Sequence, residues 1–549
     1  MLRQAPGTAP ATIPRNSPRT RPRWWAGPVP AAVLLAGCLQ SVWALFLATD
    51  GGDMAAQYAW AQFARAHPGS AYDLAWYGGM HPASYSVLTP YLMAVLGVRT
   101  AGVVTGTLCA LVLARLVVRS GVRRPLLTAL CGAAGVACNT ASGRITFGIG
   151  LMFAVAAVAA VYETRGTPRA RALAAGLLGV LAVLASPVDG LFLLVAVPGL
   201  FVTGRRPAAY AFVAAPLLVV GATTVLFPFY GVQPISAGQV ALVLVTAVPV
   251  ALLSPRSWRV VRLGAWAYTL GTLLTAVIPS PIGSNVERLS LLFAATVLLP
   301  AATAARGRRA AALWLAFAVA LSWQSVQPVA DLLASAPAAG STQDAKPLVA
   351  ELDRLGAGSG RVEVVDAASH VGAAALAPYF ELARGWNRQE DVQRNPLFYQ
   401  GGLTPAEYRA WLLKWAVGYV VVPDAPLDYA SVAEDGVVDS GQPWLRPVWK
   451  DAHWQVYRVT DPAPLAPAPA SVLDAGAAAL TVKVPTAGST MLRVVWSPWL
   501  QVLGAGQGCL TPDGQWTRLT AEAPGTYVIG ARYTLPSRSP CPPTAEPDH

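Results

Sequence analysis

Long apolar runs, separated by short charged segments, occupy most of the first 329 residues of this chain. A helix of roughly 20 apolar residues crosses a bilayer. We expect about eleven spans, at 28–48, 100–118, 125–141, 145–162, 172–186, 188–204, 209–227, 236–253, 264–279, 288–305 and 310–328. Such a pattern predicts a polytopic α-helical membrane protein, because a helix satisfies its own backbone hydrogen bonds within lipid.

Arginine predicts the orientation of these spans. The first 329 residues hold 24 arginines, no lysine and six acids, and threading the runs through a bilayer places 20 arginines on the side of the N-terminus. Short arginine-rich loops mark the cytoplasm. We therefore expect a disordered cytoplasmic tail at 1–25, a plasma-membrane location and an outer C-terminus. Five of the acids then lie at the outer face, namely Asp50, Asp53, Asp73, Asp189 and Glu287.

The net charge of +12 is the sum of two unlike parts. The first 329 residues contribute +18 (24 Arg against 6 acids) and the remainder −6 (16 Lys and Arg against 22 acids). The positive charge therefore lies mainly in the predicted inner loops, where it sets orientation. This distribution excludes nucleic acid as the partner and indicates the lipid bilayer.

The chain after the transmembrane domain at 26–329 predicts two extracytoplasmic parts. Residues 330–460 mix a helical stretch at 406–417 with short β runs at 362–365 and 418–424, which is typical of an α/β domain. A Pro/Ala linker at 461–470 leads to alternating runs that predict a small antiparallel β-sandwich within 461–549. Cys509 and Cys541 lie there, and a disulfide between them stays open.

The first outer loop, at 49–99, is unusually long. We expect two helices in it, at 53–66 and 84–97, lying on the outer membrane surface. Trp60, Trp76 and Tyr77 suit such an interface, where aromatic side chains gather.

Asp50 and Asp53 flank two glycines where the first span leaves the membrane. A carboxylate at the rim of an apolar cavity can serve as a general base, because partial burial raises its basicity. The alternative is a solvated helix end, where Asp and Gly are common.

Aromatic and cationic residues suggest where substrates bind. Trp76 and Tyr77 precede His81, and aromatics beside an acid form a platform for a sugar ring; the alternative, which the aromatics alone favour, is a membrane-interface belt. Arg144 and the pair Asn285 and Arg288 lie in outer turns, where a planar guanidinium could hold a lipid phosphate. The alternative is that Arg288 pairs with Glu287 or an Asp; Asp189 could be that partner.

An acid after the first span, a long outer loop, and His81-Pro82 followed by Tyr85 together resemble the GT-C superfamily of integral membrane glycosyltransferases. The resemblance implies polyprenyl-phosphate-sugar donors and an outer-loop aspartate as the base. Asp53 matches that position, with Tyr58 five residues later, and Asp50 is the second choice. Met54 follows Asp53 where many relatives have an acid, so use of a divalent cation stays open and no metal ligand is assigned.

Longer strings are similar to those of a group of actinobacterial GT-C-type membrane proteins, among them SGRITFGIGL (142–151), PSPIGSNVERLSLLFA (279–294) and ARGWNRQEDVQRNPLFY (383–399). In the last string, Arg384 and Trp386 could dock an acceptor glycan, or they could belong to a loop that clamps the domain to the membrane part.

The sequence thus predicts a GT-C-like enzyme that moves a sugar from a polyprenyl-phosphate donor to an envelope glycan or lipid acceptor at the outer face of the membrane. A multi-pass transporter is the first alternative, although the ionisable groups lie at the ends of spans. A non-catalytic envelope assembly or export factor of GT-C shape is the second.

Overall fold

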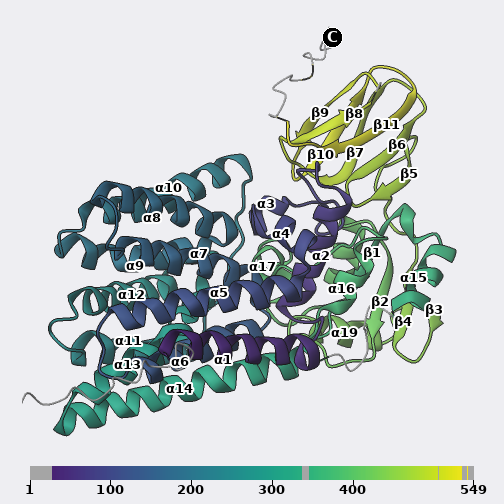
Figure 1. Ribbon diagram of the computed structural model, residues 1–549. Coiled ribbons are helices and arrows are strands. Elements are labelled where there is room, and N and C mark those ends of the chain that lie inside the picture. Colours follow the sequence, from purple (N-terminus) through teal and green to yellow (C-terminus); the bar gives the residue numbers. More distant parts are fainter. Residues whose placement is uncertain (1–26, 337–344, 505, 535–540, 542–549) are drawn as a thin grey trace, which may run out of the picture.

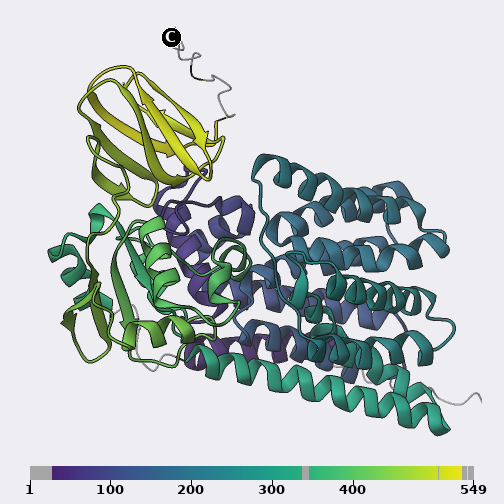
Figure 2. The ribbon, with the colours of Figure 1, turned by 180° about the vertical axis from the view of Figure 1, so that it is seen from behind.

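The computed structural model describes residues 27–336, 345–504, 506–534 and 541. The tail predicted at 1–25 lies outside the described residues. Figure 1 shows a bundle of long helices with an α/β part and a set of β-sheets gathered at one end of it. Figure 2 shows the same division from behind.

The helical bundle consists of helices that begin and end close to the predicted spans. They are α1 (Pro28–Val42, continued by the π-helical turn η2, Trp43–Leu47), α5 (Val98–Arg119), α6 (Pro125–Ala141), α7 (Ile145–Val161), α8 (Pro168–Ala185), α9 (Pro187–Val202), α10 (Arg206–Leu226), α11 (Ala237–Leu253), α12 (Arg259–Val277), α13 (Arg288–Ala304, preceded by η3, Gly283–Glu287) and α14 (Gly307–Ser335).

Seven described helices are long and apolar enough to cross a membrane, and four shorter apolar helices, α6, α7, α9 and α11, lie among them. Their outward faces leave large apolar side chains exposed, including Leu45, Phe46, Leu218 and Leu315. Many large apolar side chains exposed on apolar helices suit lipid rather than water. The chain is therefore a membrane protein, and the full number of eleven spans stays a prediction.

The outer loop forms α2 (Asp53–Ala66), α3 (Pro82–Tyr85) and α4 (Thr89–Leu96). The membrane-interface interpretation of its aromatics is wrong, because Trp60, Trp76 and Tyr77 are almost fully buried. Trp60 and Trp76 pack edge to face, with ring centroids 5.3 Å apart, inside a core shared with the α/β part. The sequence suggested that these aromatic side chains contact lipid, but the α/β part of the same chain covers them.

The α/β part is built on a four-stranded sheet. It contains α15 (Ala345–Arg354), η4 (Ala357–Ser359), β1 (Arg361–Val364), α16 (Val371–Leu376), α17 (Arg388–Arg394), η5 (Pro396–Phe398), α18 (Pro405–Lys414), β2 (Val417–Pro423), α19 (Val432–Asp439), β3 (Leu445–Lys450) and β4 (Trp454–Val459). The strand order is β1-β2-β4-β3, with β1 and β2 parallel and the other pairs antiparallel. The two β runs expected from the sequence are β1 and β2.

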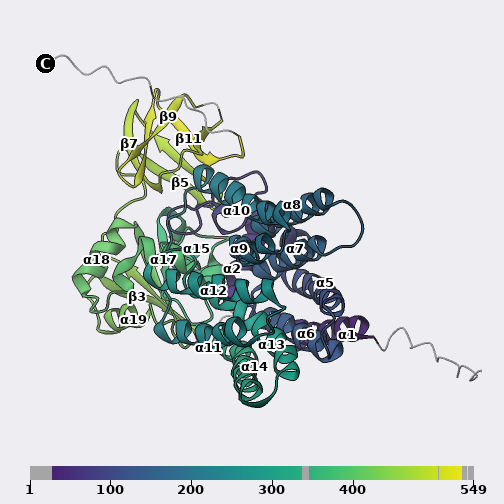
Figure 3. The ribbon, with the colours of Figure 1, turned by 90° about the vertical axis from the view of Figure 1, so that its left-hand side faces the viewer.

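The C-terminal strands form two antiparallel sheets, seen to one side of the bundle in Figure 3. Their orders are β7-β10-β9 and β5-β6-β11-β8. The strands are β5 (Ser471–Gly476), β6 (Ala479–Val484), β7 (Gly488–Val495), β8 (Leu500–Leu503), β9 (Gly508–Asp513), β10 (Trp516–Ala521) and β11 (Gly525–Ala531). Both sheets contribute to one buried cluster, which also takes in Leu465 and Ala466 of the expected linker. The 461–470 segment is therefore packed rather than free.

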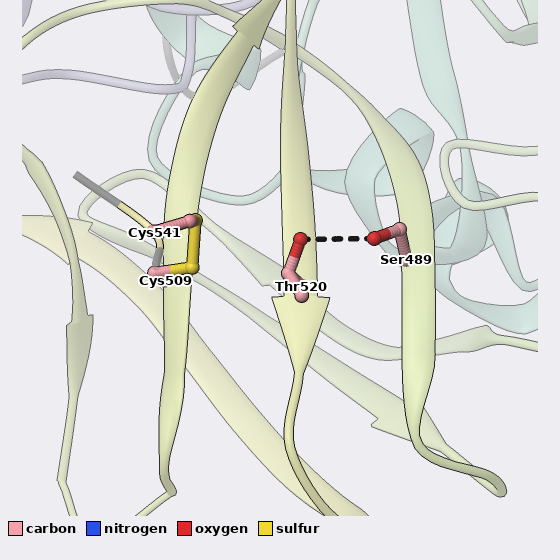
Figure 4. The surroundings of a disulfide bond; sticks show 4 residues. All are labelled: Ser489, Cys509, Thr520 and Cys541. Carbon is pink, nitrogen blue, oxygen red and sulfur yellow. Dashed lines mark hydrogen bonds between the residues drawn. A yellow bond between two sulfur atoms is a disulfide. The ribbon is translucent and has the colours of Figure 1, made fainter. Parts of the chain in front are cut away.

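Cys509 on β9 forms a disulfide with Cys541 (Figure 4), so the pairing that the sequence left open is present. On the neighbouring strands, the hydroxyls of Ser489 and Thr520 lie 2.9 Å apart, a cross-strand hydrogen bond between β7 and β10. The disulfide ties the end of the chain to the edge of the three-stranded sheet.

Candidate functional site

A cavity of about 580 Å³ lies where the bundle meets the α/β part, and we call it the main cavity. One side is apolar, with side chains of α8, α9 and α10 such as Val183, Leu191 and Val220. The other side is charged and polar, and its lining includes Asp53, Arg144, Asn285, Glu287, Arg288, Trp386 and Arg388. The cavity can therefore hold a molecule with an apolar chain and an anionic, polar head.

Asp53 is the first residue of α2 and faces the guanidinium of Arg288, with Oδ2 and Nη2 3.7 Å apart. Its side chain is 41% exposed, so the carboxylate stays within reach of a substrate. Arg288 begins α13, and its guanidinium also lies over the Phe147 ring, 5.1 Å from the centroid. A carboxylate and a fork-shaped cation thus stand side by side at the charged end of the main cavity.

Arg144 lies in the turn between α6 and α7, where it meets two acids. Its Nη2 is 3.4 Å from Asp331 Oδ2 and 3.7 Å from Glu287 Oε1. Asp331 comes from the last turns of α14, which runs past the predicted end of the span at 328 and past the expected domain boundary. Both arginines singled out in the sequence reach the main cavity, and both have carboxylate neighbours.

Gln57 fixes the relative positions of Asp53 and Arg144, and the sequence interpretation missed it. Its Nε2 donates to the carbonyls of Asp53 (2.9 Å) and Gly143 (2.6 Å), while Oε1 accepts from the N–H of Thr146 (3.1 Å). Gly143 has φ +72°, a conformation that favours glycine, and a Cβ there would lie 3.0 Å from Met54. Helix α2 is thereby locked onto the α6–α7 turn.

A second set of contacts, which we call the glycine clamp, holds the turn before Asp53. The indole Nε1 of Trp386 donates to the Gly52 carbonyl (2.7 Å), and the Gly52 N–H donates to the Ser369 carbonyl (2.7 Å). Gly51 has no room for a side chain, since a Cβ would lie 2.5 Å from the Ser335 carbonyl oxygen. His370 stacks on Trp386 with centroids 3.4 Å apart. No sequence motif signals the clamp, because it joins residues more than 300 positions apart.

His370, which stacks on Trp386 in the glycine clamp, is itself held between two carboxylates. Its two ring nitrogens lie 3.3 Å from Asp366 and 3.5 Å from Asp428. Burial alone would lower the pKa of His370, but the two carboxylates outweigh burial and raise it above its usual value. Asp428 is in turn held by Arg388, at 2.6 Å. The protonated ring is therefore favoured beneath the indole of Trp386.

A side cavity of about 210 Å³ lies on another side of Asp53. It is bounded by η2 and the turn after it, the end of α14 and the α/β part, and its lining includes Thr49, Gly51, Asp331, Ser335 and His370. Asp53, Arg144, Trp386 and Arg388 line both cavities. The Asp53 carboxylate is thus at a junction that two molecules can approach from different directions.

Four residues expected to form a sugar or acceptor platform do not line either cavity. Trp76, Tyr77, His81 and Arg384 are all 5% exposed or less. Tyr77 donates its hydroxyl to the Gly385 carbonyl (2.6 Å), so it supports the loop that carries Trp386. His81 donates from Nδ1 to the Ala71 carbonyl (2.7 Å) and accepts from the Ser497 hydroxyl (3.0 Å), and burial lowers its pKa to about 4. These residues are structural supports; of the expected platform only Trp386 lines a cavity.

Arg384 belongs to a buried ion network instead of an acceptor surface. Its guanidinium is 2.7 Å from Asp391, 3.0 Å from Glu434 and 3.6 Å from Glu363. One cation cannot balance three buried acids, and burial raises the pKa of Glu434 to about 7 despite Arg384. The network fixes the 384–391 loop within the α/β part, whereas Trp386 of the same string contacts the membrane part through Gly52.

Asp50 and Tyr58, also candidates, turn away from both cavities. Arg99 donates to the Asp50 carboxylate (2.8 Å) and to the Tyr58 hydroxyl (3.1 Å). Asp50 lies three residues before Asp53 and outside α2, whereas Asp53 is the first residue of that helix. The two aspartates are therefore distinguished by position, and Asp53 alone of the pair lines the cavities.

Asp189, the other suggested partner of Arg288, is fully buried in α9 and makes no side-chain hydrogen bond among the described residues. The described residues also contain no group of three or more His, Cys, Asp or Glu side chains arranged to hold a metal ion. The ion pair that Arg288 makes is with Asp53.

Comparisons with known proteins give three findings. A family model described as a domain of unknown function, DUF8823, matches residues 467–546, which hold the C-terminal sheets. No curated protein matches the sequence. Solved structures that resemble the chain include two glycosyltransferases.

The first is the mycobacterial arabinofuranosyltransferase AftD, 15% identical, with a TM-score of 0.45; the match covers 85% of this chain and 43% of AftD. The second is the oligosaccharyltransferase of Archaeoglobus fulgidus, 11% identical, with a TM-score of 0.39, covering 72% of this chain and 68% of that one. Both are members of the GT-C superfamily, which the sequence also resembles. The chain spans less than half the length of AftD, and similarity of this size carries no conclusion about activity.

Proposed function

We propose that this protein is a membrane glycosyltransferase that moves a sugar from a polyprenyl-phosphate donor to an envelope glycan or lipid acceptor at the outer face of the plasma membrane. The observation that carries the proposal is the Asp53–Arg288 pair, placed at the charged end of a half-apolar cavity. A lipid-linked phosphosugar has the matching distribution of apolar chain, negative charge and hydroxyls.

In the proposed reaction, the lipid chain lies against α8–α10 and the phosphate lies near Arg288 and Arg144. An acceptor hydroxyl approaches from the side cavity. The Asp53 carboxylate takes its proton as the oxygen attacks the anomeric carbon, and the bond from that carbon to the phosphate oxygen breaks. Polyprenyl phosphate leaves with the negative charge, which the arginine fork stabilises. Attack from the face opposite the phosphate inverts the anomeric carbon.

Replacing Asp53 tests the role of the base. Asp53→Asn keeps the size of the side chain but cannot accept the proton, so transfer should fall by about 10²–10⁴. Binding of a sugar-free polyprenyl phosphate should stay the same or tighten, because Arg288 loses its carboxylate partner. The measurements are sugar transfer by purified variants and profiles of lipid-linked sugars and envelope glycans in a deletion strain carrying each variant.

Asp50→Asn is the matched control, since the same change three residues away breaks an ion pair with Arg99 outside the cavities. It should keep at least half of the wild-type transfer when membrane levels are equal. Full transfer by Asp53→Asn would refute the assignment of the base. Full activity of the double variant would favour the non-catalytic assembly or export factor.

Replacing Arg288 tests the donor site. Arg288→Lys keeps the charge but loses the bidentate fork, so binding of polyprenyl phosphate should weaken about tenfold, and Arg288→Ala should weaken it further. The loss of one charge-assisted contact is worth roughly 1.5–3 kcal/mol. Equal affinity in wild type and Arg288→Ala would show that Arg288 serves only to hold Asp53.

A further inference from the structure

Another charged cavity lies at the end of the bundle remote from Asp53. It has a volume of about 460 Å³ and opens between the end of α5, the end of α7 and the start of α8. Four arginines line it, and Glu163 is the single acid among its lining residues. The arginines are Arg115, Arg119, Arg165 and Arg171.

The positive charge of this cavity is largely uncompensated. The Glu163 carboxylate accepts from the Thr164 N–H (2.8 Å) and from Arg119 (3.1 Å), and these contacts, the Thr164 bond foremost, hold its pKa below the usual range. Glu163 is therefore ionised and neutralises one arginine. Arg115, Arg165 and Arg171 make no ion pair with any described carboxylate.

Arg171 has one donor group that no acceptor satisfies among the described residues. Its Nη1 donates to the backbone carbonyl of Glu163 (2.6 Å), which anchors the guanidinium at the cavity wall. Its Nε is buried and has no hydrogen-bond partner among the described residues. A buried N–H without an acceptor is costly, so a ligand oxygen at this place would stabilise the cavity.

The remaining lining is apolar and small. Ala156, Ala159 and Ala160 of α7 face Ala170 and Ala174 of α8, and α5 adds Val112 and Leu116. Arg115 lies one helical turn before Arg119, roughly 6 Å deeper along α5. The cavity thus combines cations near the helix ends with an apolar floor towards the middle of the bundle, which is the polarity of a lipid headgroup and its first acyl carbons.

Arginine alone does not mark a site, because every predicted inner loop carries it as an orientation signal. The junction of α13 and α14 is an example, where Arg306 precedes α14, Arg308 lies in its first turn, and both are exposed. The cavity differs from that junction in having a defined volume, a buried unsatisfied N–H and an apolar floor. An acidic protein surface would meet the exposed arginines but would not fill the alanine-lined floor.

We propose that this cavity binds an anionic phospholipid. Arg115, Arg165 and Arg171 contact its phosphate, and the acyl chain lies in the alanine-lined groove between α7 and α8. Basic pockets between helices at the cytoplasmic side of a membrane bind such headgroups. The site is independent of the proposed sugar transfer, since it lies at the other end of the bundle.

The test uses the full-length protein in mixed micelles, titrated with phosphatidylglycerol or with phosphatidylcholine, with thermal stabilisation as the readout. We expect stabilisation by phosphatidylglycerol only. Removing one arginine should weaken the apparent affinity about fivefold, and Arg115→Gln with Arg171→Gln about 25-fold. The matched double variant Arg306→Gln with Arg308→Gln should bind as the wild type does. Glu163→Gln, which keeps every arginine and frees Arg119, should tighten binding several-fold.

Equal affinity of the cavity variant and the wild type would overturn the proposal. Equal weakening in both double variants would do the same, because it would assign the effect to general surface charge. Inorganic phosphate and polyglutamate are added as separate probes; saturation by either at concentrations where phosphatidylglycerol has no effect would identify a soluble anion or an acidic partner instead. If the cavity variant does not fold, unchanged binding by Glu163→Gln would refute the lipid site.

Discussion

At the scale of single residues, the outer acids of this chain have different environments although the sequence groups them together. Asp53 is partly exposed beside Arg288, Asp50 is held by Arg99, and Asp73 is 5% exposed with no cation paired to it among the described residues. Asp73 Oδ1 accepts from the Ala75 N–H (2.9 Å), but burial outweighs this bond and raises the pKa of Asp73 to about 7. Only Asp53 combines access with a neighbouring cation at a cavity.

The raised pKa of Asp73 predicts a pH dependence of stability. The unfolded chain ionises this group near its usual value of 3.8, whereas the folded protein keeps it protonated up to about 7. Stability should therefore fall as the pH rises from about 4 to 7 and stay lower above that range. Asp73→Asn retains the carbonyl that accepts from Ala75 and cannot ionise, so it should raise the melting temperature at pH 8 and leave it nearly unchanged at pH 4.

The control for this prediction is Asp513→Asn, a partly exposed acid on β9 paired with Arg518. It should not stabilise the protein at pH 8. A melting temperature of Asp73→Asn that is lower than wild type at pH 8 but equal to it at pH 4 would show that the carboxylate is stabilising when charged, contrary to the expected effect of burial.

At the scale of elements, the site depends on how α2 begins. The turn 50–52 leads from η2 into α2, and its backbone is held by the glycine clamp and by the Thr49–Ser335 hydroxyl pair at 2.9 Å. Gln57 holds the next turn of the helix to the α6–α7 turn. The first turn of α2 is thus fixed by three separate elements, which leaves the Asp53 carboxylate little freedom of position.

Weakening the glycine clamp should slow sugar transfer without weakening the binding of the polyprenyl-phosphate donor. Trp386→Phe keeps an aromatic ring on His370 but removes the Nε1–H bond to Gly52. A displacement of about 1 Å in a catalytic group can cost around 10² in rate, so we expect the turnover number of Trp386→Phe to fall 10–100-fold with polyprenyl-phosphate affinity retained. Steady-state kinetics that separate the turnover number from the Michaelis constant check this.

The chain offers a matched control in Trp411→Phe, which removes an indole bond to Asn395 Oδ1 (2.9 Å) inside the α/β part, where neither residue lines the main cavity or the side cavity. This variant should lose stability but keep the turnover number. Equal losses of turnover in both variants would mean that the effect of Trp386→Phe is general destabilisation rather than positioning of Asp53.

At the scale of the whole molecule, the α/β part lies against one end of the bundle and the C-terminal sheets lie beside that end, next to the outer-loop helices, as Figures 1 and 2 show. The proposed site is at this end. The arginine distribution predicts that this end is outside the cell. Single cysteines at Gly69 and Ser440, both exposed, should react with an impermeant maleimide in intact cells, and one at Arg308 should react only after lysis. The background variant is Cys38→Ala, because Cys38 is the exposed free cysteine of the described chain.

Labelling of Arg308→Cys in intact cells, together with protection of Ser440→Cys, would reverse the orientation. It would also place the Asp53 site in the cytoplasm, and the proposed polyprenyl-phosphate donor of the outer leaflet would then be excluded. The Gly69 position checks the outer loop separately, since a Cβ at Gly69 meets no other atom within 4 Å.

What the sequence determined by itself is the part that depends on local chemistry. Apolar length predicted where the helices of the bundle lie, with α14 extending further than expected, and short β runs predicted β1 and β2. Asp53, Arg144, Asn285, Arg288 and Trp386 were candidates on residue type, and all of them line the main cavity. These features follow from interactions between neighbours in the chain, or between a side chain and the membrane, and both can be read along the sequence.

Only the tertiary structure decided which candidates meet. Trp76, Tyr77 and Trp60 have the composition of a membrane-interface belt, yet the α/β part covers them, and Arg384 lies in a buried network formed by Asp391, Glu434 and Glu363. Asp50 and Asp53 are nearly equivalent in sequence and are separated by contacts with Arg99 and Arg288, which lie 49 and 235 positions from their partners. Burial of a side chain and pairing of charges depend on surfaces that meet only when distant segments of the chain pack together. Residue type and spacing therefore identified candidate residues for this site but could not show which of them lie in contact.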